Sequence, residues 1–330
     1  MFEFMMKYKK YELYILLSFV LCAACSSQKT PPAFEVLNAK QTGLNFINKL
    51  TPTNDFNVFH YMYFYNGAGV AAGDFNNDGL IDLFFASNQG QNKLYLNTGN
   101  MHFKDATAEA HIPNDGGWST GVSVVDINND GLLDLYVCRV GKYEVLNSHN
   151  EFLICKGIDK NGVPQYEDEA KQLGIDFSGF STQAAFFDYD GDGDLDMYLL
   201  NHSIHQNGTF GPRNILINTP SDVSGDHFFR NDNGHFTDVT KQAGINSSIL
   251  GYGLGLSVAD INMDGWPDVY VGNDFHEKDY LYINNHDGTF KEEDSSCFMH
   301  TSQYTMGVDV ADINNDALPE IFRTFLYYFL

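Results

Sequence analysis

Five short segments of the chain carry oxygen-bearing side chains at alternate positions, a spacing that suits cation binding. The first segment has Asp74, Asn76, Asp78 and Asp82 at positions 1, 3, 5 and 9, and a glycine follows position 5. The backbone carbonyl of Leu80, at position 7, offers one more oxygen. A set of ligands that are all oxygen favours Ca²⁺ over Zn²⁺, which prefers nitrogen and sulfur, and over Mg²⁺, which retains more water.

The pattern recurs in loops that we number 1 to 5, residues 74–82, 126–134, 188–196, 260–268 and 312–320. The candidate calcium ligands, loop by loop, are Asp74, Asn76, Asp78, Leu80 and Asp82; Asp126, Asn128, Asp130, Leu132 and Asp134; Asp188, Asp190, Asp192, Asp194 and Asp196; Asp260, Asn262, Asp264, Trp266 and Asp268; and Asp312, Asn314 and Asp316.

Crowded carboxylates give a second reason to expect a cation. Two carboxylates 4 Å apart repel each other by about 1 kcal/mol in water and by about 4 kcal/mol at an effective dielectric constant of 20. Ordinary turn chemistry would explain one such loop, but not four that carry acids at positions 1, 5 and 9. An EF-hand fits poorly, because its last ligand stands at position 12 and its flanks are helical.

The stretches that flank each loop are short and apolar, and several are rich in Val, Tyr and Phe, which predicts strands. Each loop is then the turn of a hairpin between two buried strands. Further downstream, 92–107, 228–240 and 280–290 each read as strand, Asn/Gly turn and strand, which predicts outer hairpins. An inner and an outer hairpin together make a four-stranded antiparallel sheet, the unit of a β-propeller.

Across roughly residues 34–320, the Gly-Val-x-x-x-Asp-x-Asn-x-Asp-Gly-x-x-Asp-Leu pattern, with Leu-Tyr-x-Asn and Phe-x-Asp-x-Thr between copies, resembles the FG-GAP/VCBS repeats of integrin-α-like β-propellers. It is most similar to bacterial secreted proteins related to the cartilage acidic protein (ASPIC/UnbV) group. The resemblance implies a ring of usually seven blades with Ca²⁺ in the inter-strand loops. We therefore predict an all-β fold, a β-propeller over 34–330 with five recognisable blades.

The fifth copy departs from the pattern in two places. Ala317 replaces the turn glycine and Glu320 replaces the last aspartate, so about four well-formed calcium loops are expected. The chain ends directly after this copy, and its last residues are apolar. We therefore expect the propeller over 34–330 to be C-terminally truncated, either as a truncated or frameshifted product or as one piece of a longer gene whose ring has more blades.

The N-terminus predicts export. Lys7, Lys9 and Lys10 precede an uncharged apolar run over 13–24 that is too short to span a bilayer as a helix. A cysteine then follows two alanines, which resembles a bacterial lipobox. We predict a lipoprotein signal peptide over 1–24, lipidation of Cys25, a linker over 25–33 and an outer membrane location held by the lipid anchor alone. Plain secretion is the alternative.

Three cysteines remain in the mature chain, Cys138, Cys155 and Cys297. An odd number does not make a disulfide framework. A bridge between Cys138 and Cys155 and buried free thiols both stay open.

The charge of the whole chain limits its partners. With 19 basic and 43 acidic residues, the formal net charge is −24, and this opposes nucleic-acid binding, which depends on basic surfaces. No nucleophile elbow, phosphate loop or dinucleotide fingerprint is present. The favoured function is a non-enzymatic, calcium-stabilised surface propeller that binds a protein or a glycan. A polysaccharide lyase built on a propeller is the alternative, and it would need a catalytic cluster of Lys, Arg, His or Tyr in the channel.

Overall fold

The computed structural model describes residues 33–204, 211–275, 277–293, 302 and 304–325, and the chain divides into two compact units, 1–38 and 39–330. The expected signal peptide, the lipidation site Cys25 and Cys297 lie outside the described residues. The helices and strands of the described residues all belong to the second unit. Within the described residues, three one-turn helices occur, α2 (Ala39–Thr42), α3 (Ala170–Leu173) and α4 (Arg213–Leu216). No described helix is long and apolar enough to cross a membrane.

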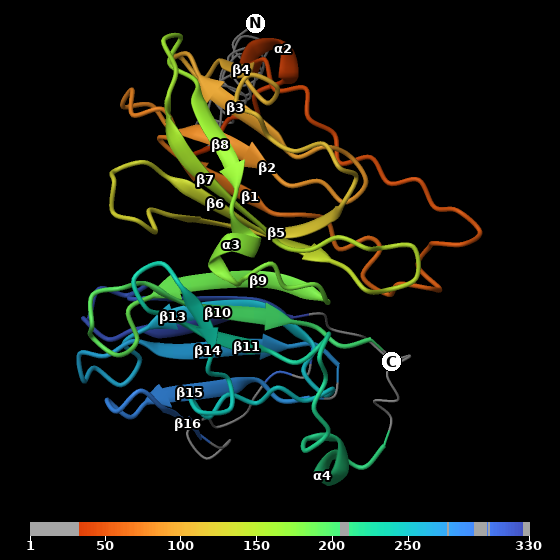
Figure 1. Cartoon of the computed structure of the whole chain (residues 1–330), viewed down its shortest axis with the longest axis vertical. Helices are drawn as coiled ribbons and strands as arrows, with labels where there is room; N and C mark the ends of the chain where they lie inside the picture. The colour runs from red at the N-terminus through yellow and green to blue at the C-terminus, as the bar shows by residue number, and fades with distance from the viewer. Residues whose placement is uncertain (1–32, 205–210, 276, 294–301, 303, 326–330) are drawn as a thin grey trace, which may run out of the picture. The chain divides into compact units, whose positions relative to one another are not determined.

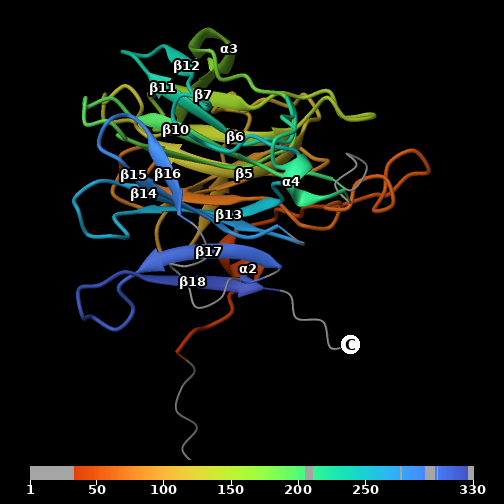
Figure 2. The same ribbon diagram turned by 90° about the horizontal axis from the view of Figure 1, so that it is seen from below.

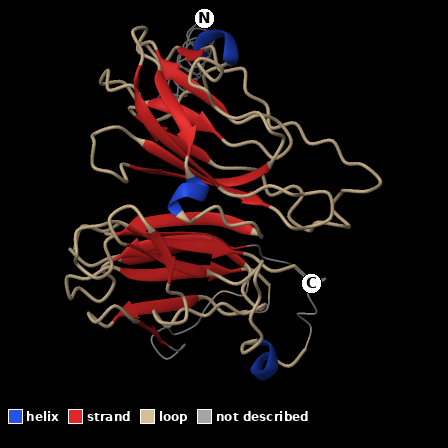
Figure 3. Cartoon of the chain, in the orientation of Figure 1, coloured by secondary structure: helices blue, strands red, loops and turns tan. Residues whose placement is uncertain are grey.

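Antiparallel sheets make up nearly all of the regular structure (Figures 1 and 3), which confirms the all-β prediction. We call each sheet a blade. The blades contain, in order, β1 (Val70–Gly73), β2 (Asp82–Phe85), β3 (Lys93–Asn97) and β4 (Phe103–Asp105); β5 (Trp118–Val125), β6 (Asp134–Val140), β7 (Glu151–Ile158) and β8 (Pro164–Asp168); β9 (Ser181–Phe187), β10 (Asp196–Asn201), β11 (His227–Asn231) and β12 (Phe236–Asp238); β13 (Gly253–Ala259), β14 (Asp268–Asn273), β15 (Tyr280–Asn284) and β16 (Phe290–Glu293); and β17 (Thr305–Ala311) and β18 (Glu320–Phe325).

Each acidic loop joins the first two strands of its blade, as predicted. In blade 1, Gly73 pairs with Asp82 across the loop and Val70 pairs with Phe85 at the far end of the hairpin. The three outer hairpins predicted downstream are also present, as β3–β4, β11–β12 and β15–β16. Blade 2 has the same plan, although its outer hairpin β7–β8 lacks the Leu-Tyr-x-Asn signature. The described part is therefore an incomplete β-propeller.

The first strands of the blades pack side by side, in the order β1, β5, β9, β13 and β17. Figure 2 shows the β17–β18 pair beside β13. These strands run in the same direction, because equivalent residues near their starts lie side by side, as Gly69 does with Gly121 and Gly255 with Gly307. The acidic loops therefore gather at one end of the propeller, and the starts of the first strands gather at the other end.

The glycine that opens the repeat motif allows these strands to approach closely. A Cβ atom on Gly69 would lie 2.9 Å from the backbone nitrogen of Val122, and one on Gly255 would lie 2.8 Å from that of Val308. A Cβ atom on Gly121 would overlap the carbonyl oxygen of Thr182. The motif glycine is thus a packing residue between blades rather than a turn residue.

The core consists of layers between blades. Neighbouring residues of a buried strand point to opposite faces, so Val137 packs toward blade 1 and Tyr136 packs toward blade 3. A further cluster joins the segment before β1, at Phe56 and Tyr61, to Trp118 at the start of β5. Since each strand faces two layers, the apolar runs seen in the sequence are continuous.

Cys138 and Cys155 are buried free thiols. They belong to different clusters, on opposite faces of blade 2. The structure therefore contains no disulfide between these two cysteines.

Gly121→Ala should destabilise the protein by about 1–3 kcal/mol, the usual cost of overpacking a well-packed interior, because its methyl group meets backbone rather than a movable side chain. Gly251→Ala is the matched control, since the nearest atom to its added methyl group would be Oδ1 of Asn273 at 3.8 Å. Chemical denaturation of both variants measures the difference. Equal free energies of unfolding would contradict the packing role of Gly121.

Candidate functional site

The five acidic loops share one backbone conformation. Positions 4 and 6 of each loop have positive φ angles, which glycine and asparagine adopt more readily than other residues. The pairs are Asn77 and Gly79, Asn129 and Gly131, Gly191 and Gly193, Met263 and Gly265, and Asn315 and Ala317. Ala317 holds a φ of 68° in spite of its Cβ atom. The two departures in loop 5 therefore leave its backbone conformation unchanged.

The first aspartate of each loop organises the turn. Asp74 accepts hydrogen bonds from the backbone N–H groups of Asp78 at 3.0 Å and Gly79 at 2.8 Å. Loops 2, 4 and 5 repeat both bonds. In loop 3, Asp188 accepts instead from Gly191 and Gly193. Each bond uses one acceptor position of an oxygen, so lone pairs remain on every carboxylate for a cation.

The last aspartate of loops 1 to 4 is buried and binds two separate segments of the blade. One oxygen of Asp82 accepts a hydrogen bond from the N–H of Phe75 at 3.0 Å, and the other accepts from the N–H of Asn97 at 2.6 Å. We call the four residues the clamp aspartates. The other three are Asp134, bonded to Ile127 and Cys155; Asp196, bonded to Tyr189 and Asn231; and Asp268, bonded to Ile261 and Asn284. Each clamp aspartate ties the start of its loop to the third strand.

Burial also makes ionisation of the clamp aspartates costly. It raises the pKa of Asp82 and Asp134 to about 6 and that of Asp196 to about 7, although the backbone N–H groups act in the opposite direction. Burial raises the pKa of Asp268 as well. The other acids of the same loop add to each rise. A cation in the loop would favour the ionised form of all these carboxylates.

Loop 3 shows the strongest need for a cation among the described loops. Asp188, Asp190 and Asp196 each bring a carboxylate oxygen to within 4.8 Å of the others. Oδ1 of Asp190 is buried and has no hydrogen-bond partner among the described residues. A buried oxygen left without a donor is costly, and a bound cation would satisfy it. The all-oxygen donor set and this orphaned atom fit Ca²⁺.

The residue at position 3 distinguishes loop 3 from the other four. In loop 1, Asn76 donates its side-chain N–H to Oδ2 of Asp78 at 3.0 Å. The asparagines of loops 2, 4 and 5 make the equivalent bond. The carboxylate of Asp190 has no N–H to donate. The carboxylates of loop 3 therefore lack the hydrogen bond from position 3 that the other loops have.

The remaining predicted ligands divide into two groups. Oδ2 of Asp194 accepts a hydrogen bond from the backbone N–H of Asn233 in the outer turn, and neither Asp194 nor Asp192 belongs to the three-acid cluster. Leu80, Leu132 and Trp266 stand at position 7, where the backbone carbonyl is the candidate ligand. The ring of Trp266 stacks on that of His286, with centroids 4.9 Å apart.

In loop 5, Glu320 replaces the clamp aspartate. Its longer side chain still accepts a hydrogen bond from the N–H of Ile313, at 2.8 Å, and another from the side chain of Asn314. Asp312 and Asp316 keep the bonds seen in the other loops. The loop is therefore built like the others.

A second recurring polar contact was not predicted. An Asp or Asn side chain just before or at the start of the third strand caps the connection from the second strand. In blade 3, one oxygen of Asp226 accepts from the N–H of Asn201 at 2.9 Å and the other accepts from the hydroxyl of Tyr198 at 2.8 Å. In blade 2, Asn150 takes this place beside Tyr136. The tyrosine that stands two residues after the clamp aspartate recurs in the sequence and could have indicated this contact. Nothing in the sequence marks the Asp or Asn residue to which it bonds.

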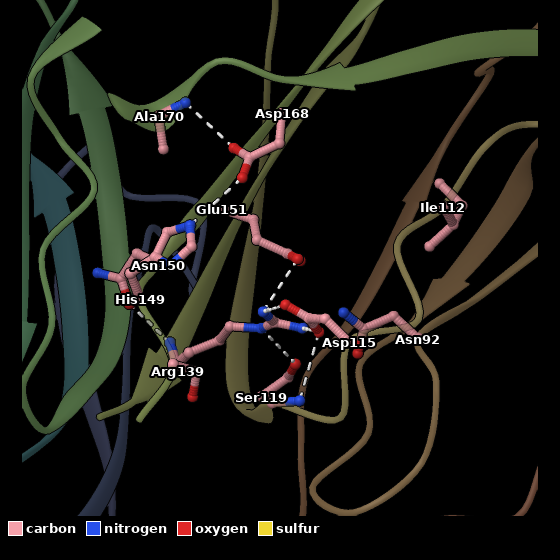
Figure 4. A network of polar contacts seen from close by, with 12 residues as sticks. Asn92, Ile112, Asp115, Ser119, Arg139, His149, Asn150, Glu151, Asp168 and Ala170 are labelled. Carbon is pink, nitrogen blue, oxygen red and sulfur yellow. Dashed lines mark hydrogen bonds and ion pairs between the residues drawn. The ribbon is translucent and has the colours of Figure 1, made fainter. Parts of the chain in front are cut away.

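Figure 4 shows an ion network beside blade 2 that sequence reasoning also missed. Arg139 is buried and makes two parallel hydrogen bonds to Asp115, at 2.7 and 2.6 Å. It lies 3.0 Å from the buried Glu151, whose pKa is raised to about 7 chiefly by burial. The network joins the loop before β5 to the second and third strands of the blade.

A cavity of about 330 Å³ lies at the end opposite the acidic loops. His202, in its wall, is held by the Tyr61 hydroxyl at 3.0 Å from Nε2 and by the Thr182 hydroxyl at 3.2 Å from Nδ1. Burial lowers the pKa of His202 to about 3, so the ring is neutral. Tyr61 and Trp118 complete this side of the wall.

Asp226 should make stability depend on pH. Burial raises its pKa from the model-peptide value of 3.8 to about 7, so the folded state holds the proton between about pH 4 and pH 7. Stability therefore falls as pH rises through this window, by at most about 1.4 kcal/mol per pH unit. In Asp226→Asn this part of the slope should vanish, because the amide can bond as Asn150 does in blade 2.

Denaturation at pH 5 and pH 8 in EDTA tests this expectation. The variant should be more stable than the wild type at pH 8, and Asp55→Asn, at an exposed position, should not be. An unchanged slope in Asp226→Asn would show that Asp226 ionises without cost.

Comparison with known proteins agrees with the repeat architecture. The FG-GAP-like repeat profile matches residues 62–137, 213–271 and 260–322. Cartilage acidic protein 1 of Homo sapiens is 28% identical over 138 residues, which are 41% of this chain and 20% of that protein. Cartilage acidic protein 1 of Xenopus tropicalis is 30% identical over 138 residues, again 41% of this chain and 20% of that protein. The chain thus matches about a fifth of the length of these curated relatives.

Two solved structures show distant likeness. An Agrocybe aegerita lectin that recognises non-reducing terminal N-acetylglucosamine is 16% identical, with a TM-score of 0.42 over 77% of this chain and 59% of the lectin. A Bacillus licheniformis rhamnogalacturonan lyase is 16% identical, with a TM-score of 0.33 over 76% of this chain and 48% of the lyase. Likenesses this distant say nothing about what the present chain binds.

The profile matches cover more than half of the chain, and they fall on blades whose acidic hairpins follow one plan. The chain belongs to the FG-GAP-like repeat family.

Proposed function

We propose that this chain is a calcium-stabilised β-propeller module that binds a protein or glycan partner outside the cell. The observation that supports it most is the three-acid cluster of loop 3, with the orphaned buried oxygen of Asp190. Ca²⁺ would be held by side-chain oxygens of Asp188, Asp190 and Asp196 there, and by the equivalent residues of loops 1, 2 and 4.

The role of the ion is structural. Every loop is a turn within one hairpin, and the clamp aspartate links it to the third strand of the same blade. An ion that favours ionised carboxylates would offset part of the burial cost of the clamp. It would also relieve repulsion in a chain with a net charge of −24, since each Ca²⁺ offsets two negative charges.

Two features support an extracellular location. The relatives are named as proteins of cartilage, and extracellular calcium modules bind at about 10⁻⁴–10⁻³ M. The predicted signal peptide over 1–24 and lipidation at Cys25 would place the propeller at a bacterial cell surface, anchored through lipid alone. Secretion without an anchor is the alternative location.

Binding is favoured over catalysis by what lines the cavity opposite the loops. A lyase needs a general base and a cation or basic group to stabilise a developing anion. Among the described residues, the cavity wall includes no Asp, Glu, Lys or Arg, and the one histidine is engaged at both nitrogens. Two tyrosines also line the wall, but the hydroxyl of Tyr61 is bonded to His202 and that of Tyr63 to Asp274, and burial raises the pKa of both. This wall therefore favours binding over proton transfer.

Thermal unfolding in calcium and in EDTA tests the proposal. Extracellular calcium modules bind with a Kd of about 10⁻⁴–10⁻³ M. At 10 mM Ca²⁺, each occupied site should therefore raise the free energy of unfolding by about 1.4–2.7 kcal/mol and the Tm by several degrees. Mg²⁺ should have a smaller effect. Asp190→Asn gives loop 3 the asparagine of the other loops, so it should fold and lose part of the calcium-dependent shift.

Asp55→Asn is the matched control, because it removes the same charge from an exposed position outside the loops. It should keep the full shift. A wild-type Tm that is the same in calcium and in EDTA would rule out a structural calcium role.

A further inference from the structure

The cavity opposite the acidic loops is built by all five blades. Val70, Val122, Gln183, Leu254 and Met306, one residue from each first strand, lie in its wall. The acidic loops stand at the other ends of these same strands. The cavity is therefore separate from the proposed calcium sites, and any ligand in it meets residues that the ions do not touch.

The wall is free of charge in an otherwise strongly acidic protein. Among the described residues that line the cavity, the polar groups are amides, hydroxyls, backbone groups and the neutral His202. The carboxylate of Asp274 lies behind Tyr63, whose hydroxyl bonds to it. A cationic ligand would find no counter-charge here, and an anionic one would find no arginine or lysine.

Gln183 breaks the regularity of the repeat at this place. The equivalent position of the other four blades is glycine, namely Gly69, Gly121, Gly255 and Gly307. Packing between blades favours glycine there, so a glutamine calls for another explanation. Its amide makes no hydrogen bond within the described part of the chain, although it lies in the cavity wall. An amide presents both donors and an acceptor, a combination that suits vicinal hydroxyl groups.

We propose that this cavity binds one neutral sugar ring, the terminal residue of a glycan, and that Gln183 holds its hydroxyl groups. The inference rests on the proposed binding function and names its ligand class. The apolar side chains of Val70, Val122, Leu254 and Met306 supply contacts for the C–H faces of a pyranose. A volume of about 330 Å³ is at the small end of ligand sites, with room for a single ring.

Binding is measured on the full chain with free monosaccharides in calcium buffer. The probes are glucose, galactose, mannose, fucose and N-acetylglucosamine as neutral sugars, and glucuronate, galacturonate and glucosamine as charged ones. Trp118 lies in the wall and Trp266 in loop 4, so tryptophan fluorescence with ligand-observed NMR reports occupancy. At least one neutral sugar should bind with a millimolar or tighter Kd, and its charged counterparts should bind at least about tenfold more weakly.

Gln183→Ala should weaken that binding by about tenfold or more, the effect of losing the hydrogen bonds of one side chain. Gln242→Ala, at an exposed position, should not change it. Gln183→Gly restores the residue of the other blades, so it should unfold at the wild-type temperature and also lose binding. This variant separates loss of the ligand contact from loss of the fold.

The proposal is overturned if no neutral sugar binds at tens of millimolar, if a charged sugar is preferred, or if Gln183→Ala binds as well as the wild type. The calcium-dependent Tm of the same samples distinguishes the two levels of failure. A normal calcium shift without sugar binding refutes only the sugar site. Loss of the calcium shift refutes the proposed function itself.

Discussion

The buried clamp aspartate is the interaction on which each complete blade depends. Its two oxygens accept backbone hydrogen bonds from the start of the acidic loop and from the third strand, as Asp82 does with Phe75 and Asn97. No neutral residue provides two strong acceptors with this reach. This arrangement requires a buried carboxylate, whose ionisation is unfavourable, as the raised pKa of Asp196 indicates. Acids at positions 1 and 5 lie in the same loop as the clamp aspartate, joined in blade 3 by Asp190 at position 3. A cation bound in the loop would therefore act directly on the clamp.

The hairpins were predictable because their determinants are local. Asparagine and glycine at the positive-φ positions, and acids at positions 1, 5 and 9, all lie within nine residues. The outer hairpin of blade 2 was not identified in the same way. There, Cys155 stands where Asn97 stands in blade 1, but only its backbone N–H is used by Asp134. A contact made by the backbone places little demand on residue type, so the signature can disappear while the structure stays.

The polar groups that the sequence did not reveal depend on contacts between distant segments. Arg139 donates a hydrogen bond to Asp115, which precedes the first strand of the blade. Tyr198 donates one to Asp226, which lies beyond the long connection between β10 and β11. Side-chain direction within loop 3 was equally hidden from the sequence. Asp194 lies inside the loop in sequence, but its carboxylate turns to the backbone of Asn233 in the outer turn. Which oxygens converge depends on side-chain direction, and spacing does not specify it.

Blade 3 departs from its neighbours at both ends of the same strand. At the start of β9, Gln183 replaces the packing glycine, and in the loop that follows, Asp190 replaces the asparagine that would compensate charge. Both replacements work against regular repeat packing or internal charge balance, and neither is needed to build a blade, as the other blades show. A repeat protein gains its ring from what the repeats share, whereas specific ligand contacts require departures from it. Because β9 is packed between β5 and β13, one strand carries a residue of the cavity wall near its start and leads into the acidic loop at its end.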